Sequence, residues 1–154
     1  MIGAAFLLTT QVIETIQMPA PPISEAIPAT RFSCELLDGA GNRFTLRGTF
    51  PEAAAGWDPN RGMPAKIEGE GQAQLTGTHE MKPFGAGVEF RRYYVTARKP
   101  DGAGHYNLLF VLLNGETSLV TVDSFSRDPA TGRGTMSAFA TGDCEAEFEV
   151  GSAK

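Results

Sequence analysis

The sequence predicts an all-β fold: an antiparallel up-and-down barrel, or a strongly curved sheet or sandwich, of about eight strands. An N-terminal apolar segment and a proline-rich linker precede it. From Thr30 onward, apolar and polar residues alternate with the period of a half-buried strand. Runs of turn residues separate these stretches, and the pair Asn114-Gly115 favours a type I′ hairpin. The pattern shows no β-α-β alternation, so a parallel sheet is not expected.

The chain divides into an N-terminal segment over residues 1–29 and a single β domain over residues 30–154. Residues 1–13 carry no charge and begin with eight apolar residues, which is too short for a transmembrane span of about 20 residues. Two interpretations stay open: the apolar core of a signal peptide, with small residues for cleavage at 24–26, or an amphipathic helix or arm. Four prolines between 19 and 28 then predict an extended linker.

The first two strands are expected at 32–36 and 43–50, joined by the turn residues of 38–42 as a hairpin. In the first strand Phe32, Cys34 and Leu36 share one face. A long connection over residues 51–64 follows.

The third strand is expected at 66–75, after Pro64. Its inward positions include the small residues Gly69 and Gly71. Small inward residues indicate strong bending, close packing of a bulky neighbour, or room for a ligand.

The fourth strand is expected at 88–98, with a change of parity. Val88 and Phe90 share one face, whereas Tyr93 and Val95 share the other. A β-bulge near Arg91 and Arg92 would produce this pattern.

The remaining strands follow the turns at 99–104, 114–116 and 127–134. Residues 105–113 are apolar on both faces from Leu108 to Leu113, which is typical of a strand buried on both sides. A protein contact or the wall of an apolar cavity is the alternative. Residues 117–126 form the returning strand, and residues 135–150 form one long bent strand or two short ones.

The two cysteines, Cys34 and Cys144, both point inward by the alternation of their strands. If the barrel closes by pairing its first and last strands, the two residues face each other at disulfide distance. Two buried, unlinked thiols are the alternative. Because disulfides are rare in reducing compartments, the predicted bridge and the signal-like segment together favour a periplasmic or extracellular location.

Composition excludes several partners and reactions. The chain has 13 Lys and Arg against 18 Asp and Glu, with a formal net charge of −5, so it lacks the basic excess that binds nucleic acid or anionic membranes. Two His and two Cys without ligand spacing predict no metal site. No phosphate-binding glycine loop is present, and no cofactor is predicted. No catalytic residue is predicted, because neither histidine shares a motif with a cysteine or serine.

Two features supply candidate binding residues. The stretch Arg91, Arg92, Tyr93 and Tyr94 combines residue types that are enriched at interface hot spots. A surface strand whose arginine stems cover apolar neighbours gives the same pattern. Trp57, the only tryptophan, is expected either to cap an open end of the barrel or to anchor packing.

Glu68 and Glu70 lie two residues apart on one strand face and are the best candidates for acid–base chemistry. A solvated outer face is the favoured interpretation of this pair.

These observations predict a non-enzymatic, exported β-domain that binds a small apolar ligand inside or a protein partner on its surface. The first alternative is a structural subunit of a homo-oligomeric or filamentous assembly, in which the N-terminal arm and the apolar strand at 108–113 pack against neighbouring copies. The second alternative is a carboxylate-dependent hydrolase.

Overall fold

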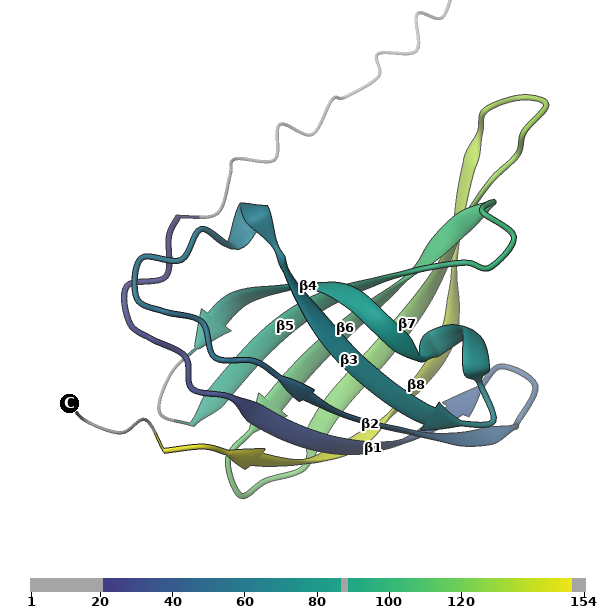
Figure 1. The fold of residues 1–154 in the computed structure, drawn as a ribbon. Coiled ribbons are helices and arrows are strands. Elements are labelled where there is room, and N and C mark those ends of the chain that lie inside the picture. Colours follow the sequence, from purple (N-terminus) through teal and green to yellow (C-terminus); the bar gives the residue numbers. More distant parts are fainter. Residues whose placement is uncertain (1–20, 87–88, 151–154) are drawn as a thin grey trace, which may run out of the picture.

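The computed structural model describes residues 21–86 and 89–150, which form a closed barrel of eight antiparallel strands (Figure 1). Each strand pairs with its neighbours in sequence order, and the last strand returns to pair with the first. The predicted all-β barrel is therefore confirmed. The strands are β1 (Thr30–Asp38), β2 (Arg43–Phe50), β3 (Met63–Glu70), β4 (Gly77–Ala86), β5 (Phe90–Arg98), β6 (Gly104–Leu113), β7 (Ser118–Arg127) and β8 (Gly134–Phe148).

Two short 3₁₀ helices, η1 (Pro59–Arg61) and η2 (Ala73–Leu75), lie in the connections before β3 and before β4. Among the described residues, no helix is long and apolar enough to cross a membrane. The two interpretations of the N-terminal segment fall on residues 1–20, outside the described residues.

The predicted third strand was wrong at both ends. The strand β3 begins at Met63 rather than after Pro64, and it ends at Glu70. Gly71 then adopts a φ of 87°, which interrupts an extended chain and which glycine adopts without steric cost. The alternating residues that follow form η2 instead of continuing the strand.

The sequence pattern did not predict the strand β4. Its inward, buried positions are His79, Met81 and Pro83. Only one of these three is an apolar residue of the kind that marks a strand, and proline is depleted in strands. The period-two signal was therefore hidden.

The predicted bulge at Arg91 and Arg92 was also wrong. The pairing of β5 with β6 runs without interruption from Phe90 to Arg98, and Arg91 points inward with Tyr93. The apolar ring of Phe90 lies on the outer face, which made the parity look reversed, and Val88 lies outside the described residues. The register shift in this region lies on β4, between Pro83 and Gly85.

The last strand is one continuous element of 15 residues. It carries a register shift, since Val122 pairs with Ala140 and Asp123 pairs with Ala138. Phe139 is thus the extra residue of a β-bulge, which bends the long strand.

Aromatic side chains occupy the inside of the barrel. The ring of Phe50 lies 4.7 Å from Phe32, 4.2 Å from Tyr93 and 5.1 Å from Phe110, measured between centroids. These rings belong to β1, β2, β5 and β6, so they join opposite walls of the barrel.

Glycines on the inner wall make room for large neighbours. A Cβ atom at Gly69 would lie 2.7 Å from a methyl group of Leu46, and one at Gly48 would lie 2.8 Å from the ring of Phe32. For Gly69, close packing of a bulky neighbour is therefore the interpretation that the structure bears out.

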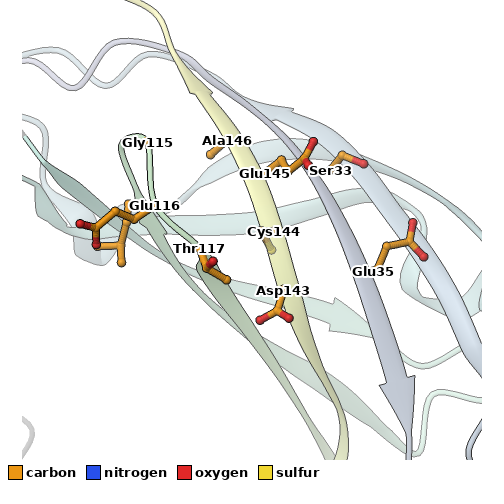
Figure 2. A pocket seen from close by; sticks show the side chains of 10 residues that line it. Ser33, Glu35, Gly115, Glu116, Thr117, Asp143, Cys144, Glu145 and Ala146 are labelled. Carbon is orange, nitrogen blue, oxygen red and sulfur yellow. The ribbon is translucent and has the colours of Figure 1, made fainter.

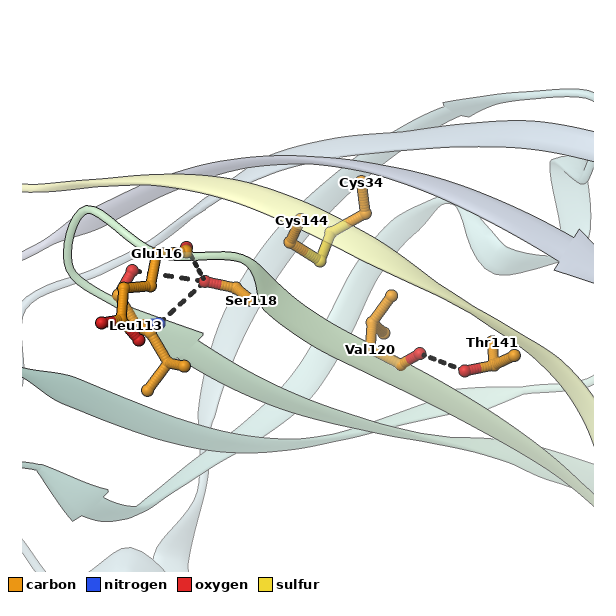
Figure 3. The surroundings of a disulfide bond; sticks show 7 residues. All are labelled: Cys34, Leu113, Glu116, Ser118, Val120, Thr141 and Cys144. Atoms are coloured by element: carbon orange, nitrogen blue, oxygen red, sulfur yellow. Dashed lines mark hydrogen bonds between the residues drawn. A yellow bond between two sulfur atoms is a disulfide. The ribbon is translucent and has the colours of Figure 1, made fainter.

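The disulfide between Cys34 and Cys144 joins β1 to β8 (Figure 3), as predicted. The two residues are direct partners in the β1–β8 register, their Cα atoms are 4.0 Å apart, and 110 positions separate them in the sequence. Both side chains are buried, with exposed fractions of 1% and 4%. The bridge thus covalently joins the first and last strands.

Replacing both Cys34 and Cys144 by Ala is expected to lower the free energy of unfolding by about 2–4 kcal/mol, because a loop this long retains much entropy when it is not cross-linked. Denaturant unfolding with and without reductant measures the effect. Reductant should destabilise the wild type and leave the double variant unchanged; equal effects on both proteins would contradict the prediction.

Candidate functional site

The predicted binding stretch on β5 is divided between the two faces of the barrel wall. Arg91 and Tyr93 point inward, with exposed fractions of 7% and 1%. Arg92 and Tyr94 point outward and are exposed. The division follows from the period of two along a strand, so the four residues do not form one surface.

The inward Arg91 closes one end of the barrel. Its guanidinium lies 4.2 Å from the ring centroid of Phe148. Because its partners lie on the segment that leads into β1 and at the end of β8, the side chain connects the two ends of the described chain. Its hydrogen-bond acceptors are the backbone oxygens of Pro28 (2.8 Å), Ala29 (3.1 Å) and Glu149 (3.3 Å) and the hydroxyl of Thr30.

The neighbouring inward residue, Tyr93, belongs to the same buried network. Its hydroxyl lies 3.0 Å from the Thr30 hydroxyl. Burial raises the pKa of the Tyr93 phenol above its ordinary value, against smaller opposite effects of Thr30 and Arg91. The residue is therefore a neutral member of the core and not an acid–base group at neutral pH.

Trp57 lies on the connection between β2 and η1, half-buried and packed against the core. Its backbone oxygen accepts a hydrogen bond from the backbone of Ile23 (3.0 Å), and the nearby backbones of Ile27 and Ala53 form an isolated bridge. The indole nitrogen of Trp57 is buried without a hydrogen-bond partner among the described residues. The structure thus places Trp57 in a segment apart from the outward Arg92 and Tyr94 of β5.

The outer face of β5, β6 and β7 carries a continuous apolar surface, here called the outer belt. In the register, Tyr94 pairs with Leu109, and Val111 pairs with Leu119, so these side chains are neighbours on one face. The six belt residues are Phe90 and Tyr94 on β5, Leu109, Val111 and Leu113 on β6, and Leu119 on β7.

The apolar strand β6 explains most of the belt. Its inward residues Leu108, Phe110 and Leu112 are fully buried, whereas its outward residues are only half-buried within the chain. At the two sides of the belt, Tyr94 is 38% exposed and Leu119 is 44% exposed. The burial on both sides that the sequence indicated is therefore complete on the inner face only.

The belt lies between opposite charges. One row of register partners runs across five strands in the order Arg92, Val111, Leu119, Asp143 and Glu35. A cation thus stands at the β5 side, two apolar residues follow, and two carboxylates stand at the β8 and β1 side. Neighbouring strands are about 4.8 Å apart, so this polarity extends over the width of the face.

An acidic groove of about 1100 Å³ adjoins the belt at Leu113, between the β6–β7 turn and the strands β8 and β1. Figure 2 shows its carboxylates: Glu116 in the turn, Asp143 and Glu145 on β8, and Glu35 on β1. None of these four takes part in the ion pairs found among the described residues, which involve Glu68, Glu70, Glu80 and Glu149 instead.

A second groove, of about 630 Å³, lies at the opposite end of β6 and is basic. Arg98, Lys99 and Arg127 line it together with His105. The amine of Lys99 donates to the hydroxyls of Ser124 and Ser126, at 2.8 and 2.6 Å. The two grooves give opposite charge to the two ends of the outer face.

The predicted carboxylate pair is on the outer face of β3 and is neutralised by basic neighbours. Glu68 forms an ion pair with Lys66, which holds the pKa of that carboxyl below its ordinary value. Glu70 lies 3.9 Å from the guanidinium of Arg47. Within residues 21–86 and 89–150, no group of three or more His, Cys, Asp and Glu is arranged to hold a metal ion.

Sequence reasoning did not identify the belt as a site. The sequence predicted Tyr94 as a binding residue and residues 108–113 as a strand that is apolar on both faces. It did not show that the two lie side by side, and it gave Leu119 no role. The missing information was the register, which alone shows that the three strands bring these residues together. No family model, no curated protein and no solved structure matches this chain.

Replacing Arg91 by Met, which keeps the contact with Phe148 but removes the donors, is expected to lower the free energy of unfolding by roughly 2–3 kcal/mol. The reason is that the buried Thr30 hydroxyl and the partly buried carbonyls of Pro28 and Ala29 lose charge-assisted hydrogen bonds. Arg98→Met, at an exposed position of the same strand, should change it by less than about 0.5 kcal/mol. Denaturant unfolding compares them, and equal losses would contradict the role of Arg91.

His79 is expected to make stability depend on pH. The side chain is 7% exposed, and its Nε2 donates to the backbone oxygen of Leu75 at 3.1 Å. Burial lowers its pKa below the ordinary 6.5, and the hydrogen bond opposes this more weakly. Above pH 6.5 both the folded and the unfolded chain hold a neutral imidazole. Below pH 6.5 the unfolded chain binds the proton before the folded chain does. The free energy of unfolding therefore decreases as the pH is lowered, by at most about 1.4 kcal/mol per pH unit.

The variant His79→Gln should lose this component, whereas His105→Gln should keep it. Urea unfolding at about pH 7.5 and about pH 5 measures the difference for each protein. The same loss on acidification in wild type and His79→Gln would show that another group is responsible.

Proposed function

We propose that this protein is a non-enzymatic, exported binding domain whose outer belt binds the surface of a protein partner. The observation that carries the proposal is the contiguous apolar surface over β5, β6 and β7, with Tyr94 and Leu119 exposed at its two sides. Monomeric proteins rarely expose large contiguous apolar patches, and those that occur commonly mark interaction sites.

The composition of the belt supports a protein partner. Its centre contains only aliphatic side chains, while Tyr94, Phe90 and Arg92 stand at its β5 side. Interfaces are depleted of charge at their centre and enriched in aromatic residues and arginine, with a polar rim around them. The acidic groove beside Leu113 supplies such a rim on the other side.

A small apolar ligand inside the barrel has less support. The rings of Phe32, Phe50, Tyr93 and Phe110 already contact one another there, so a ligand would have to displace packed aromatic side chains.

The exported location remains part of the proposal. The disulfide between Cys34 and Cys144 supports it, since such bonds persist mainly in oxidising compartments.

The two alternatives have unequal support. For a hydrolase, one of the two carboxylates should have a raised pKa and act as the acid, but Lys66 lowers the pKa of Glu68. For a structural subunit, the belt supplies a face that neighbouring copies can cover. The part of that hypothesis that assigns an arm to residues 1–20 stays a prediction.

Replacing Leu119 by Lys is expected to abolish partner capture, because a charge placed within an apolar contact must be desolvated. Immobilised full-length protein is exposed to an extract of its source, and the bound proteins are quantified by mass spectrometry. Retention should fall at least about tenfold relative to wild type.

Met136→Lys is the matched control, because Met136 is 65% exposed and lies on β8 outside the belt. It should retain the partners that the wild type retains. If no captured protein depends on Leu119, the belt is not the binding surface.

A further inference from the structure

We propose that the partner of the outer belt is a second copy of this chain, held face to face about a two-fold axis that runs parallel to the strands between β6 and β7. The inference rests on the proposed function, that the belt binds a protein surface, and it names the surface that fits. Closed dimers of this kind use the same patch on both subunits, so the patch must complement itself.

The register shows that the apolar part of the patch complements itself. The axis exchanges β6 with β7 between the copies, because it lies midway between these two strands. Val111 then faces Leu119 of the partner subunit, and Leu119 faces Val111 of the partner subunit, since the two residues lie in one row. The half-buried outer face of β6 thereby gains the cover that it lacks within the single chain.

The charges complement one another in the same arrangement. The axis also exchanges β5 with β8, so Arg92 faces Asp143 of the partner subunit in the row that contains Val111 and Leu119. Symmetry forms this contact twice, once on each side of the apolar centre. Both residues are exposed, and neither takes part in an ion pair among the described residues.

Other arrangements of the same face lack this match. A two-fold axis that runs across the strands, in the direction of the row, would bring β5 onto β5 and oppose Arg92 to its own copy, which is unfavourable for like charges. The guanidinium of Arg92 lies 5.2 Å from the ring centroid of Phe90 in the single chain, so it is already positioned over an apolar side chain at the belt's edge.

A charge exchange tests the contact. Within one chain Arg92 and Asp143 are three strands apart, about 14 Å along the sheet, which is too far for an ion pair. Recovery in a double variant therefore requires contact between copies. Full-length wild type, Arg92→Glu, Asp143→Arg and the double variant are compared by sedimentation equilibrium over a wide concentration range.

The wild type should form dimers, each single variant should raise the dissociation constant more than about tenfold, and the double variant should recover most of that loss. Arg98→Glu, outward on the same strand but in the basic groove, is the control and should leave the dissociation constant unchanged. Loss of assembly in Arg98→Glu, with none in Arg92→Glu, would assign the contact to the grooves at the barrel ends and overturn the proposal.

Two further outcomes overturn it. One is a dimer whose double variant is no tighter than the single variants. The other is a wild type that stays monomeric at all concentrations. That second result leaves the proposed function standing if the capture experiment still finds a protein that depends on Leu119, so the failure of each idea can be recognised separately.

Discussion

The pairing of the first strand with the last is the constraint on which the remaining structure depends. Residues of β1 and β8 pair from Thr30 with Phe148 to Asp38 with Ala140, without a register shift. The disulfide lies within this ladder, and Arg91 holds the segment before β1 and the residue after β8 at its end. A covalent bond and a buried cation therefore secure the one seam that joins the two ends of the sheet. Closure gives β1 a paired neighbour on each side, so the sheet is not left open at its first strand.

Where a strand is paired on both sides, as β1 is, another protein cannot be bound by adding a strand to it. Residues 134–138 of β8 extend beyond β1, whose pairing ends at Ala140, and pair with β7 alone. Over the closed part of the barrel, recognition must use outward side chains or the loops at the two ends. The outward side chains of most strands are polar or charged, and several form ion pairs, as Lys66 and Glu68 do on β3. The outer belt differs because β6 is apolar on both faces. The inner face of β6 supports the core, so only its outer face is available for binding.

Charge divides the outer surface in a way that the net charge does not reveal. The chain as a whole is acidic, with a formal net charge of −5. Carboxylates gather around the acidic groove, however, while arginines and a lysine gather around the groove at the other end of β6. The row from Arg92 to Glu35 repeats this division across the strands. Such a distribution contributes to orientation and specificity in association more than to affinity.

The sequence by itself determined the all-β class and the inward orientation of both cysteines, because period-two alternation shows which side of each strand a residue occupies. It predicted the barrel and the disulfide as the favoured alternatives, and the pairing of β1 with β8 decided both. It could not find β4, whose inward residues include His79 and Pro83, and it misjudged β5, where Arg91 is buried. Only the tertiary structure decided these points, since the hydrogen bonds that satisfy Arg91 come from segments about 60 positions away. The belt likewise exists only through register, because one-dimensional alternation does not show which residues of different strands become neighbours.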